Sequence, residues 1–206
     1  LVLTHTNAAV AALRQRLDKG AVPRSSYRLA TIDGWAMRLV GMFPLRSAAD
    51  PSILELSRPE TDYPAIKQAA LCLLQGRHID NLLAANYSRL LVDEYQDCLS
   101  AQHRIVCELA RVLPTCIFGD VLQGIFDFGD TQVDWNTEVL QDFPLVSELS
   151  TPWRWNLAGA GLLGQWLLDL RPTLLSGGQI DLSTAPSELE WVPVAGDQDF
   201  GKILAA

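Results

Sequence analysis

Four short apolar segments of this chain are separated by longer segments whose apolar residues recur with the spacing of helices. Strands that alternate with helices of about 10–15 residues are typical of a parallel sheet wrapped by helices. The sequence therefore predicts an α/β fold with strands at residues 1–4, 27–32, 88–92 and 115–118. Helices are predicted at 7–18, from 35 to 40, and at 64–74, 79–85, 101–112 and 157–170. Residues 43–62 carry three prolines and are predicted as an irregular connection, and residues 190–194 as one more strand.

Composition excludes several classes of protein. Apolar residues make up 49% of the chain and charged residues 19%, which suffices for a core and is too little charge for disorder. No apolar run free of charges and helix breakers reaches the ~18 residues of a membrane span, and no basic segment precedes an apolar one at the start. We therefore expect no membrane association and a cytoplasmic location.

Cysteine and histidine spacing argues against zinc. The four cysteines at positions 72, 98, 107 and 116 form no C-x-x-C motif, and the three histidines show no paired spacing. This pattern is typical of reduced thiols in a cytosolic protein, with Cys72, Cys107 and Cys116 expected in the core. None of the histidines, His103 included, is expected to join a metal cluster.

Charge is distributed unevenly along the chain. The net charge of -8 is unfavourable for binding nucleic acid, because phosphates are neutralised by Lys and Arg. Residues 1–46 nevertheless carry seven basic residues against two acidic ones, whereas residues 112–206 carry three against thirteen. The early basic residues fit a solvated helix face and a phosphate track equally well. They begin with Arg14, Arg16, Lys19, Arg24 and Arg28.

Polar side chains follow two of the predicted strands directly. Asp93 and Glu94 come after the strand at 88–92, and Gly119, Asp120 and Gln123 follow the strand at 115–118. The carboxyl ends of parallel strands meet at one edge of the sheet, where such folds bind ligands. One carboxylate suits Mg²⁺, its neighbour suits orienting or deprotonating water, and a glutamine amide suits a γ-phosphate. The pattern favours nucleotide chemistry over a polar loop.

Five short segments resemble, in order, motifs of the UvrD/Rep/PcrA type of superfamily 1 helicases. They are residues 3–9 (LTHTNAA), 31–36 (TIDGWA), 93–97 (DEYQD), 119–128 (GDVLQGIFDF) and 152–154 (PWR). The resemblance implies a RecA-like parallel sheet of the P-loop NTPase type, flanked by helices and carrying a helical insertion at about 43–86. It also implies ATP and Mg²⁺ as cofactors and single-stranded DNA as partner.

The resemblance assigns roles residue by residue. Asp93 would hold Mg²⁺, Glu94 would activate the attacking water, and Gln123 would contact the γ-phosphate. Trp153 would stack on the adenine, rather than serve as a core aromatic, and Arg154 would act as an arginine finger rather than in a surface salt bridge. Single-stranded DNA would contact His5, Thr6, Asn7 and Thr31 and would stack on Phe126 and Phe128, at about 1–3 kcal/mol per stacked base. Burial in the core is the alternative for these aromatics, above all for Phe126.

This chain departs from the family at several of the matched positions. Phe126 stands where the family has Tyr, and Gly129 and Asp130 stand where it has Arg and Gly. His5 and Ala8 replace Phe and Lys. Asp33 and Gly34 replace His and Ser. The departures suggest a divergent branch that serves a nuclease, repair or defence partner.

The segment that would cradle the β- and γ-phosphates, G-x-x-x-x-G-K-[ST], is not found in its expected place. Residues 196–202 have its glycine and lysine spacing, but Ile203 follows where Ser or Thr should bind Mg²⁺. We therefore expect residues 1–178 to be part of a first RecA-like motor domain and 179–206 to begin a second. The parent protein that contains this chain is expected to be an ATP-dependent 3′ to 5′ helicase or translocase, and the chain alone is expected to lack turnover.

Three alternatives stay open at this point. The chain fits a natively truncated helicase-like module that binds DNA or a partner without turnover, and it also fits part of a helicase–nuclease fusion. A small-molecule NTPase that does not use nucleic acid is the third.

Overall fold

The computed structural model describes residues 1–124 and 132–190, and the chain divides into two compact units, Leu1–Leu145 and Val146–Ala206. The first unit contains a sheet of four short parallel strands in the order β2-β1-β3-β4. They are β1 (Val2–Thr4), β2 (Leu29–Thr31), β3 (Leu90–Val92) and β4 (Thr115–Ile117). This all-parallel sheet, flanked by helices, confirms the predicted α/β class and is consistent with a RecA-like fold.

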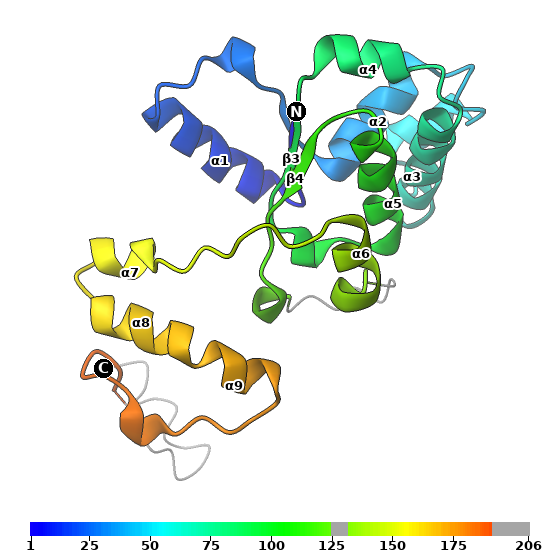
Figure 1. Cartoon of the computed structure of the whole chain (residues 1–206). Helices are drawn as coiled ribbons and strands as arrows, with labels where there is room; N and C mark the ends of the chain where they lie inside the picture. Colours follow the sequence, from blue (N-terminus) through cyan, green and yellow to red (C-terminus); the bar gives the residue numbers. More distant parts are fainter. Residues whose placement is uncertain (125–131, 191–206) are drawn as a thin grey trace. The chain divides into compact units, whose positions relative to one another are not determined.

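Helices lie on both sides of the sheet in this unit. Figure 1 shows α1 on one side of the strands and α2, α3 and α5 on the other. The longer helices are α1 (Asn7–Lys19), α2 (Ile32–Met42), α3 (Pro59–Gln75), α4 (Asp80–Asn86) and α5 (Ser100–Ala110). A π-helical turn (Trp135–Val139) leads into the short α6 (Leu140–Asp142).

The core of the first unit is formed on the side of α2, α3 and α5. Leu90 and Val92 of β3 are fully buried, whereas Leu91 between them is 37% exposed. This alternation follows from the pleat of a strand, which directs successive side chains to opposite faces. The buried partners come from the three helices and each contributes about 1.5–3 kcal/mol. They include Trp35, Leu39, Ile66, Leu73, Ile105 and Leu109.

Two threonine caps explain where the first helices begin. The Oγ1 of Thr6 accepts a hydrogen bond from the backbone N of Ala9, and the Oγ1 of Thr31 accepts one from Gly34 N. Such caps satisfy the orphan N–H groups of a first turn. Since the Thr31 cap ends β2 and starts α2 at Ile32, the strand is shorter than the predicted 27–32, and the helix starts before Trp35.

The predicted burial of the cysteines is wrong for two of them. Cys72 and Cys116 are exposed, Cys107 is half-buried, and Cys98 is the cysteine in the core. Cys72 lies on the outer side of α3, and Cys116 occupies the outward position of β4. All four thiols are free.

The connection predicted at 43–62 is irregular only in its first part. A 3₁₀ turn forms at Pro51–Glu55, and α3 already begins at Pro59. Proline fits the first helical turn, where no N–H is needed, and the helix also accommodates Pro64 within its first two turns.

The second unit contains three short helices, and the middle one occupies most of the helix predicted at 157–170. The helices are α7 (Trp153–Leu157), α8 (Gly161–Asp169) and α9 (Arg171–Leu175), followed by a 3₁₀ turn at Leu182–Thr184. Gly159 interrupts the helix with a φ of +76°, a left-handed conformation that glycine adopts at no steric cost. The strand predicted at 190–194 lies outside the described residues from position 191 onward.

Candidate functional site

The carboxyl ends of the strands bring several of the predicted nucleotide and DNA residues of the first unit to one edge of the sheet. Thr4 of β1 pairs in register with Thr31 of β2, and the backbone N of Asp93, directly after β3, donates to Leu3 O at 2.9 Å. Thr31, Thr4 and Asp93 therefore follow one another along the edge. The Oγ1 of Thr4 is buried there with no hydrogen-bond partner, so the edge has an unsatisfied polar group.

Asp93 and Glu94 form an acidic pair at this edge. Asp93 is half-buried and Glu94 is exposed, with a φ of 56° that places its backbone in the left-handed region. Burial, with the charge of Glu94, raises the pKa of Asp93. Non-glycine residues are uncommon in this region of backbone conformation, and those that adopt it cluster at functional sites. The carboxylate oxygens of this pair suit Mg²⁺, whose charge would offset their repulsion.

Gln96 connects the ends of β3 and β4 by hydrogen bonds. Its Nε2 donates to Oε2 of Glu94 at 2.7 Å, and its Oε1 accepts from the backbone N of Asp120 at 3.0 Å. Asp120 Oδ2 in turn accepts from Nε2 of Gln123 at 2.8 Å. The predicted catalytic residues Glu94 and Gln123 therefore belong to one hydrogen-bonded chain. Gln96 has no predicted role in the sequence, although its place inside the acidic cluster was the available signal.

Gly119 leaves room for the hydrogen bond between the Gln96 side chain and the backbone of Asp120. A Cβ atom at this position would lie 2.8 Å from the ring of Trp135 and 3.1 Å from Oε1 of Gln96. Contacts this short are not tolerated without displacing a neighbour. The glycine that follows β4 is therefore required for the approach of Gln96 to Asp120.

A basic pocket lies beside α1 and α2 in the same unit. Its volume is about 540 Å³, and it contains the predicted DNA residues Asn7 and Thr31. The hydroxyl of Tyr27, which also lines the pocket, is buried with no hydrogen-bond partner. Four arginines contribute to the lining: Arg14, Arg24, Arg28 and Arg38. The structure thus gathers three of the five early basic residues, together with Arg38, at one concave surface, which favours a phosphate track over a dispersed solvated face.

The charges of this pocket are only partly compensated. Arg24 pairs with Asp18 at 2.9 Å, which lowers the pKa of the Asp18 carboxyl. Within residues 1–124 and 132–190, Arg28 and Arg38 form no ion pair. Arg38 was not singled out in the sequence, because its neighbours in the pocket are distant along the chain.

The other predicted DNA residues have different surroundings. Thr6 is exposed and caps α1, so its hydroxyl is already engaged with Ala9. His5 is half-buried, and its Nε2 lies 3.6 Å from Sγ of Cys98. Phe126 and Phe128 lie outside the described residues. Their predicted stacking on bases stays a prediction.

His5 makes the stability of the first unit depend on pH. Burial lowers its pKa from 6.5 to about 4, against the opposing charges of Asp33 and Glu94. Because the unfolded chain binds the proton more readily, protonation of His5 favours unfolding. The free energy of unfolding is therefore highest above pH 6.5 and decreases as the pH falls toward 4. Between pH 7 and pH 5 the free energy of unfolding should decrease by about 2 kcal/mol through this residue.

His5→Phe removes this contribution, so urea unfolding at the two pH values should show a smaller decrease for the variant than for the unaltered chain. His78→Phe, at an exposed histidine of the same unit, is the matched control and should leave the decrease unchanged. Identical decreases for His5→Phe and the unaltered chain would contradict the burial assigned to His5.

Trp153 and Arg154 belong to the second unit. Trp153 begins α7 and is 67% exposed, and Arg154 next to it is also exposed. Trp153 is therefore not part of the core of this chain. Within the described part of the chain, Arg154 forms no salt bridge, which leaves its guanidinium available for a phosphate.

A comparison with known families identifies the middle of the chain. Residues 57–144 match the family model described as the UvrD/REP helicase N-terminal domain, and no curated protein matches the chain. The match includes Asp93, Glu94 and Gln123 and confirms the resemblance to UvrD-type helicases. His5, Thr31 and Arg154 lie outside it. Within the described residues, no helix is both long and apolar enough to cross a bilayer.

Proposed function

We propose, from the premise that this chain carries a segment of a UvrD/REP helicase N-terminal domain, that its parent protein is a cytoplasmic ATP-dependent DNA helicase or translocase moving 3′ to 5′. In this proposal, Asp93 holds Mg²⁺ at the end of β3, and Glu94 activates the water that attacks the γ-phosphate. Gln123 contacts that phosphate, while Trp153 and Arg154 take the adenine and the transition-state charge.

One observation carries the proposal. The acidic pair after β3, the glutamine after β4 and the basic pocket beside α1 and α2 are built on the same four-stranded sheet. A nucleotide motor needs this proximity, because a change at the phosphates must reach the DNA. The four arginines of the pocket suit the repeated phosphates of a DNA strand.

A second hydrogen-bonded connection supports coupling between the two regions. Nε2 of Gln102, at the start of α5, donates to Oδ1 of Asp33 in the first turn of α2 at 3.0 Å. The α5 helix follows the acidic cluster, and α2 lines the basic pocket through Gly34 and Arg38. Asp33, which departs from the family pattern, thus connects the helix that lines the basic pocket with the helix that follows the acidic cluster.

The DNA part of the proposal is tested by salt dependence. Each phosphate contact to single-stranded DNA contributes about -0.7 to the slope of log K against log salt. The double variant Arg28→Ala/Arg38→Ala should therefore bind a labelled oligonucleotide more weakly and lower the magnitude of the slope by about 1.4. Fluorescence anisotropy of the 206-residue chain at several salt concentrations measures both quantities.

Arg46→Ala is the control for loss of one charge, since Arg46 is exposed and does not line the pocket. It should retain the slope of the unaltered chain. A double variant whose slope equals that of the unaltered chain would contradict the assignment of the pocket to DNA.

The proposal also includes a protein partner. The departures from the family at positions 33 and 34 are what support a specialised nuclease, repair or defence protein as the partner in this proposal. Co-purification with the parent protein is the direct assay.

A further inference from the structure

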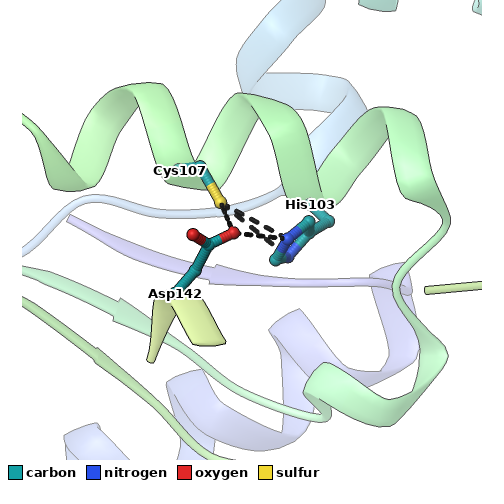
Figure 2. A group of neighbouring side chains, drawn as sticks. All are labelled: His103, Cys107 and Asp142. Atoms are coloured by element: carbon teal, nitrogen blue, oxygen red, sulfur yellow. Dashed lines mark hydrogen bonds and ion pairs between the residues drawn. The ribbon is translucent and has the colours of Figure 1, made fainter. Parts of the chain in front are cut away.

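Three side chains with metal-binding atoms meet on the surface of α5, away from the strand ends. His103 and Cys107 are one helical turn apart and lie on the same face of the helix. Asp142, at the end of α6, approaches them from the other side, and Figure 2 shows the three side chains directed toward one another. The sequence predicts no metal cluster at His103, whereas the structure brings it together with two other side chains that could hold an ion. The spacing of His103 and Cys107 was visible in the sequence, but Asp142 is 35 residues beyond Cys107.

The three ligand atoms form a triangle of the size that a tetrahedral ion needs. Nε2 of His103 lies 3.1 Å from Oδ2 of Asp142 and 3.5 Å from Sγ of Cys107, and the sulfur lies 3.3 Å from Oδ2. Zinc bonds of about 2.0–2.3 Å at tetrahedral angles place such atoms about 3.3–3.6 Å apart. The sulfur is also 3.9 Å from Nδ1, so it lies beside the ring, and the binding of an ion at Nε2 requires the thiol to rotate in front of that nitrogen.

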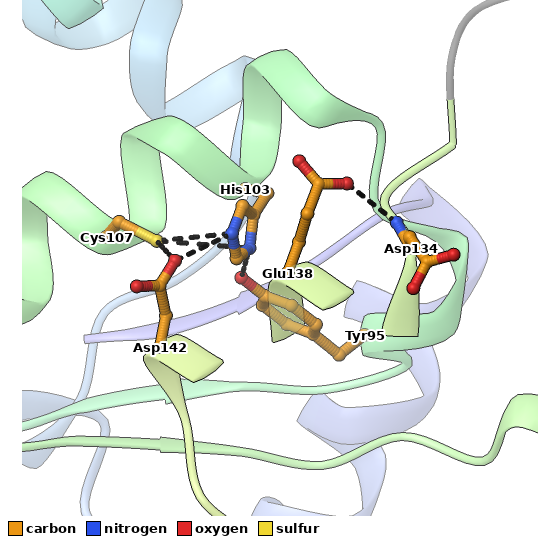
Figure 3. A network of polar contacts seen from close by, with 6 residues as sticks. All are labelled: Tyr95, His103, Cys107, Asp134, Glu138 and Asp142. Atoms are coloured by element: carbon orange, nitrogen blue, oxygen red, sulfur yellow. Dashed lines mark hydrogen bonds and ion pairs between the residues drawn. The ribbon is translucent and has the colours of Figure 1, made fainter. Parts of the chain in front are cut away.

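Tyr95 orients the histidine from behind. Its hydroxyl is hydrogen-bonded to Nδ1 of His103 at 2.8 Å, which leaves Nε2 facing the other two ligands. Metal-ligating histidines commonly donate their second N–H to such a partner, which sets the tautomer and the ring orientation. Tyr95 is fully buried and makes edge-on ring contacts with Trp135 and Phe143, so its hydroxyl is held in place. Figure 3 shows the hydrogen bond between Tyr95 and His103 together with the three clustered side chains.

The cluster has one open side. A pocket of about 280 Å³ adjoins it and includes all three ligands together with Glu138 and Gln141. His103 is buried, Cys107 half-buried and Asp142 exposed, so the group runs from the core to this pocket. A water molecule from the pocket would complete a tetrahedron.

We propose that His103, Cys107 and Asp142 bind one divalent transition metal ion of the Zn²⁺ class, with water as the fourth ligand. The mixed imidazole, thiolate and carboxylate set suits Zn²⁺ or Co²⁺, whereas Mg²⁺ and Ca²⁺ prefer oxygen ligands alone. As the metal–sulfur bond forms, the thiol proton passes to solvent, and the two negative ligands then balance the charge of the ion. The bound ion joins α6 to α5.

Co²⁺ is the probe, because a cobalt–thiolate bond produces a charge-transfer absorption band and tetrahedral Co²⁺ is intensely coloured. Titration of the 206-residue chain with Co²⁺ should show both features saturating at one ion per chain, and Zn²⁺ should abolish them at the same stoichiometry. Cys107→Ser should lose the charge-transfer band. Asp142→Asn, at an exposed position that can keep its packing, should weaken Co²⁺ binding.

Three cysteine variants serve as controls. Cys72→Ser and Cys116→Ser remove exposed thiols outside the cluster, and Cys98→Ser removes the thiol that contacts His5. All three should retain the band and the stoichiometry. Tyr95→Phe should weaken binding by about 10–100-fold, as expected for loss of a supporting hydrogen bond.

Absence of a cobalt–thiolate band in the unaltered chain would overturn the proposal, and so would a band that survives Cys107→Ser or disappears in Cys98→Ser. Circular dichroism verifies that each variant is folded, so that a lost band reflects a lost ligand. If Cys107→Ser does not fold, Asp142→Asn becomes the deciding variant, and Co²⁺ binding as tight as that of the unaltered chain would overturn the proposal. Since the readout is spectroscopic and needs neither ATP nor DNA, it is independent of the motor function proposed above.

Discussion

Glu94→Gln is expected to lower DNA-stimulated ATP turnover by the parent protein about 10²–10⁴-fold, the usual contribution of a general base. Glu94 is exposed at the end of β3, and Nε2 of Gln96 holds its carboxylate at 2.7 Å. Glutamine has the same size and can accept the same hydrogen bond through its side-chain oxygen, but it cannot take a proton from water. Binding of ATP should therefore be retained while hydrolysis is lost.

Steady-state phosphate release measures turnover, and a fluorescent nucleotide analogue measures binding in the same preparation. Glu55→Gln is the matched control, because it makes the same chemical change at an exposed position of the 3₁₀ turn before α3. It should leave turnover unaltered. Turnover by Glu94→Gln at the level of the unaltered protein would show that the base is another residue.

If Arg154 is the proposed arginine finger, Arg154→Ala should have a larger effect and lower turnover by about 10³–10⁵-fold. The guanidinium is always charged, and its planar fork matches phosphate oxygens. Arg154 is exposed in the first turn of α7, beside the exposed indole of Trp153. Arg154→Lys should restore only part of the turnover, because an ammonium group is a point charge without the fork.

Arg171→Ala, at the start of α9, is the control for charge loss in the same unit. It should turn over ATP like the unaltered protein. Equal effects of Arg154→Ala and Arg171→Ala would indicate a general electrostatic contribution and would contradict a specific role for Arg154.

The sheet could be predicted from the sequence because its strands are short apolar runs with polar ends. The segments at 88–92 and 115–118 contain β3 and β4, and the acidic pair follows β3 as expected. Boundaries were less predictable where a cap or a glycine decides them. Thr31 ends β2 by capping α2, and the left-handed Gly159 separates α7 from α8, so that α8 begins at Gly161 instead of at the predicted residue 157.

The site was predictable to the extent that its residues are consecutive in the chain. Asp93 and Glu94 are adjacent, so their shared location needed no tertiary information. The contact between Gln96 and Asp120, and the gathering of Arg14 with Arg38 at one pocket, depend on how the strands pair. Side chains brought together only by packing are invisible to a pattern of local spacing.

ATP turnover by the parent protein, measured while single-stranded DNA is titrated, is the decisive test of the proposed motor function. Turnover should rise with DNA and saturate, and Arg28→Ala/Arg38→Ala should shift the half-saturation point to higher DNA concentration at an unaltered maximum. Turnover that is the same with and without DNA would rule out the motor function and favour a small-molecule NTPase. DNA binding with no turnover at any DNA concentration would contradict it as well, in favour of a binding module.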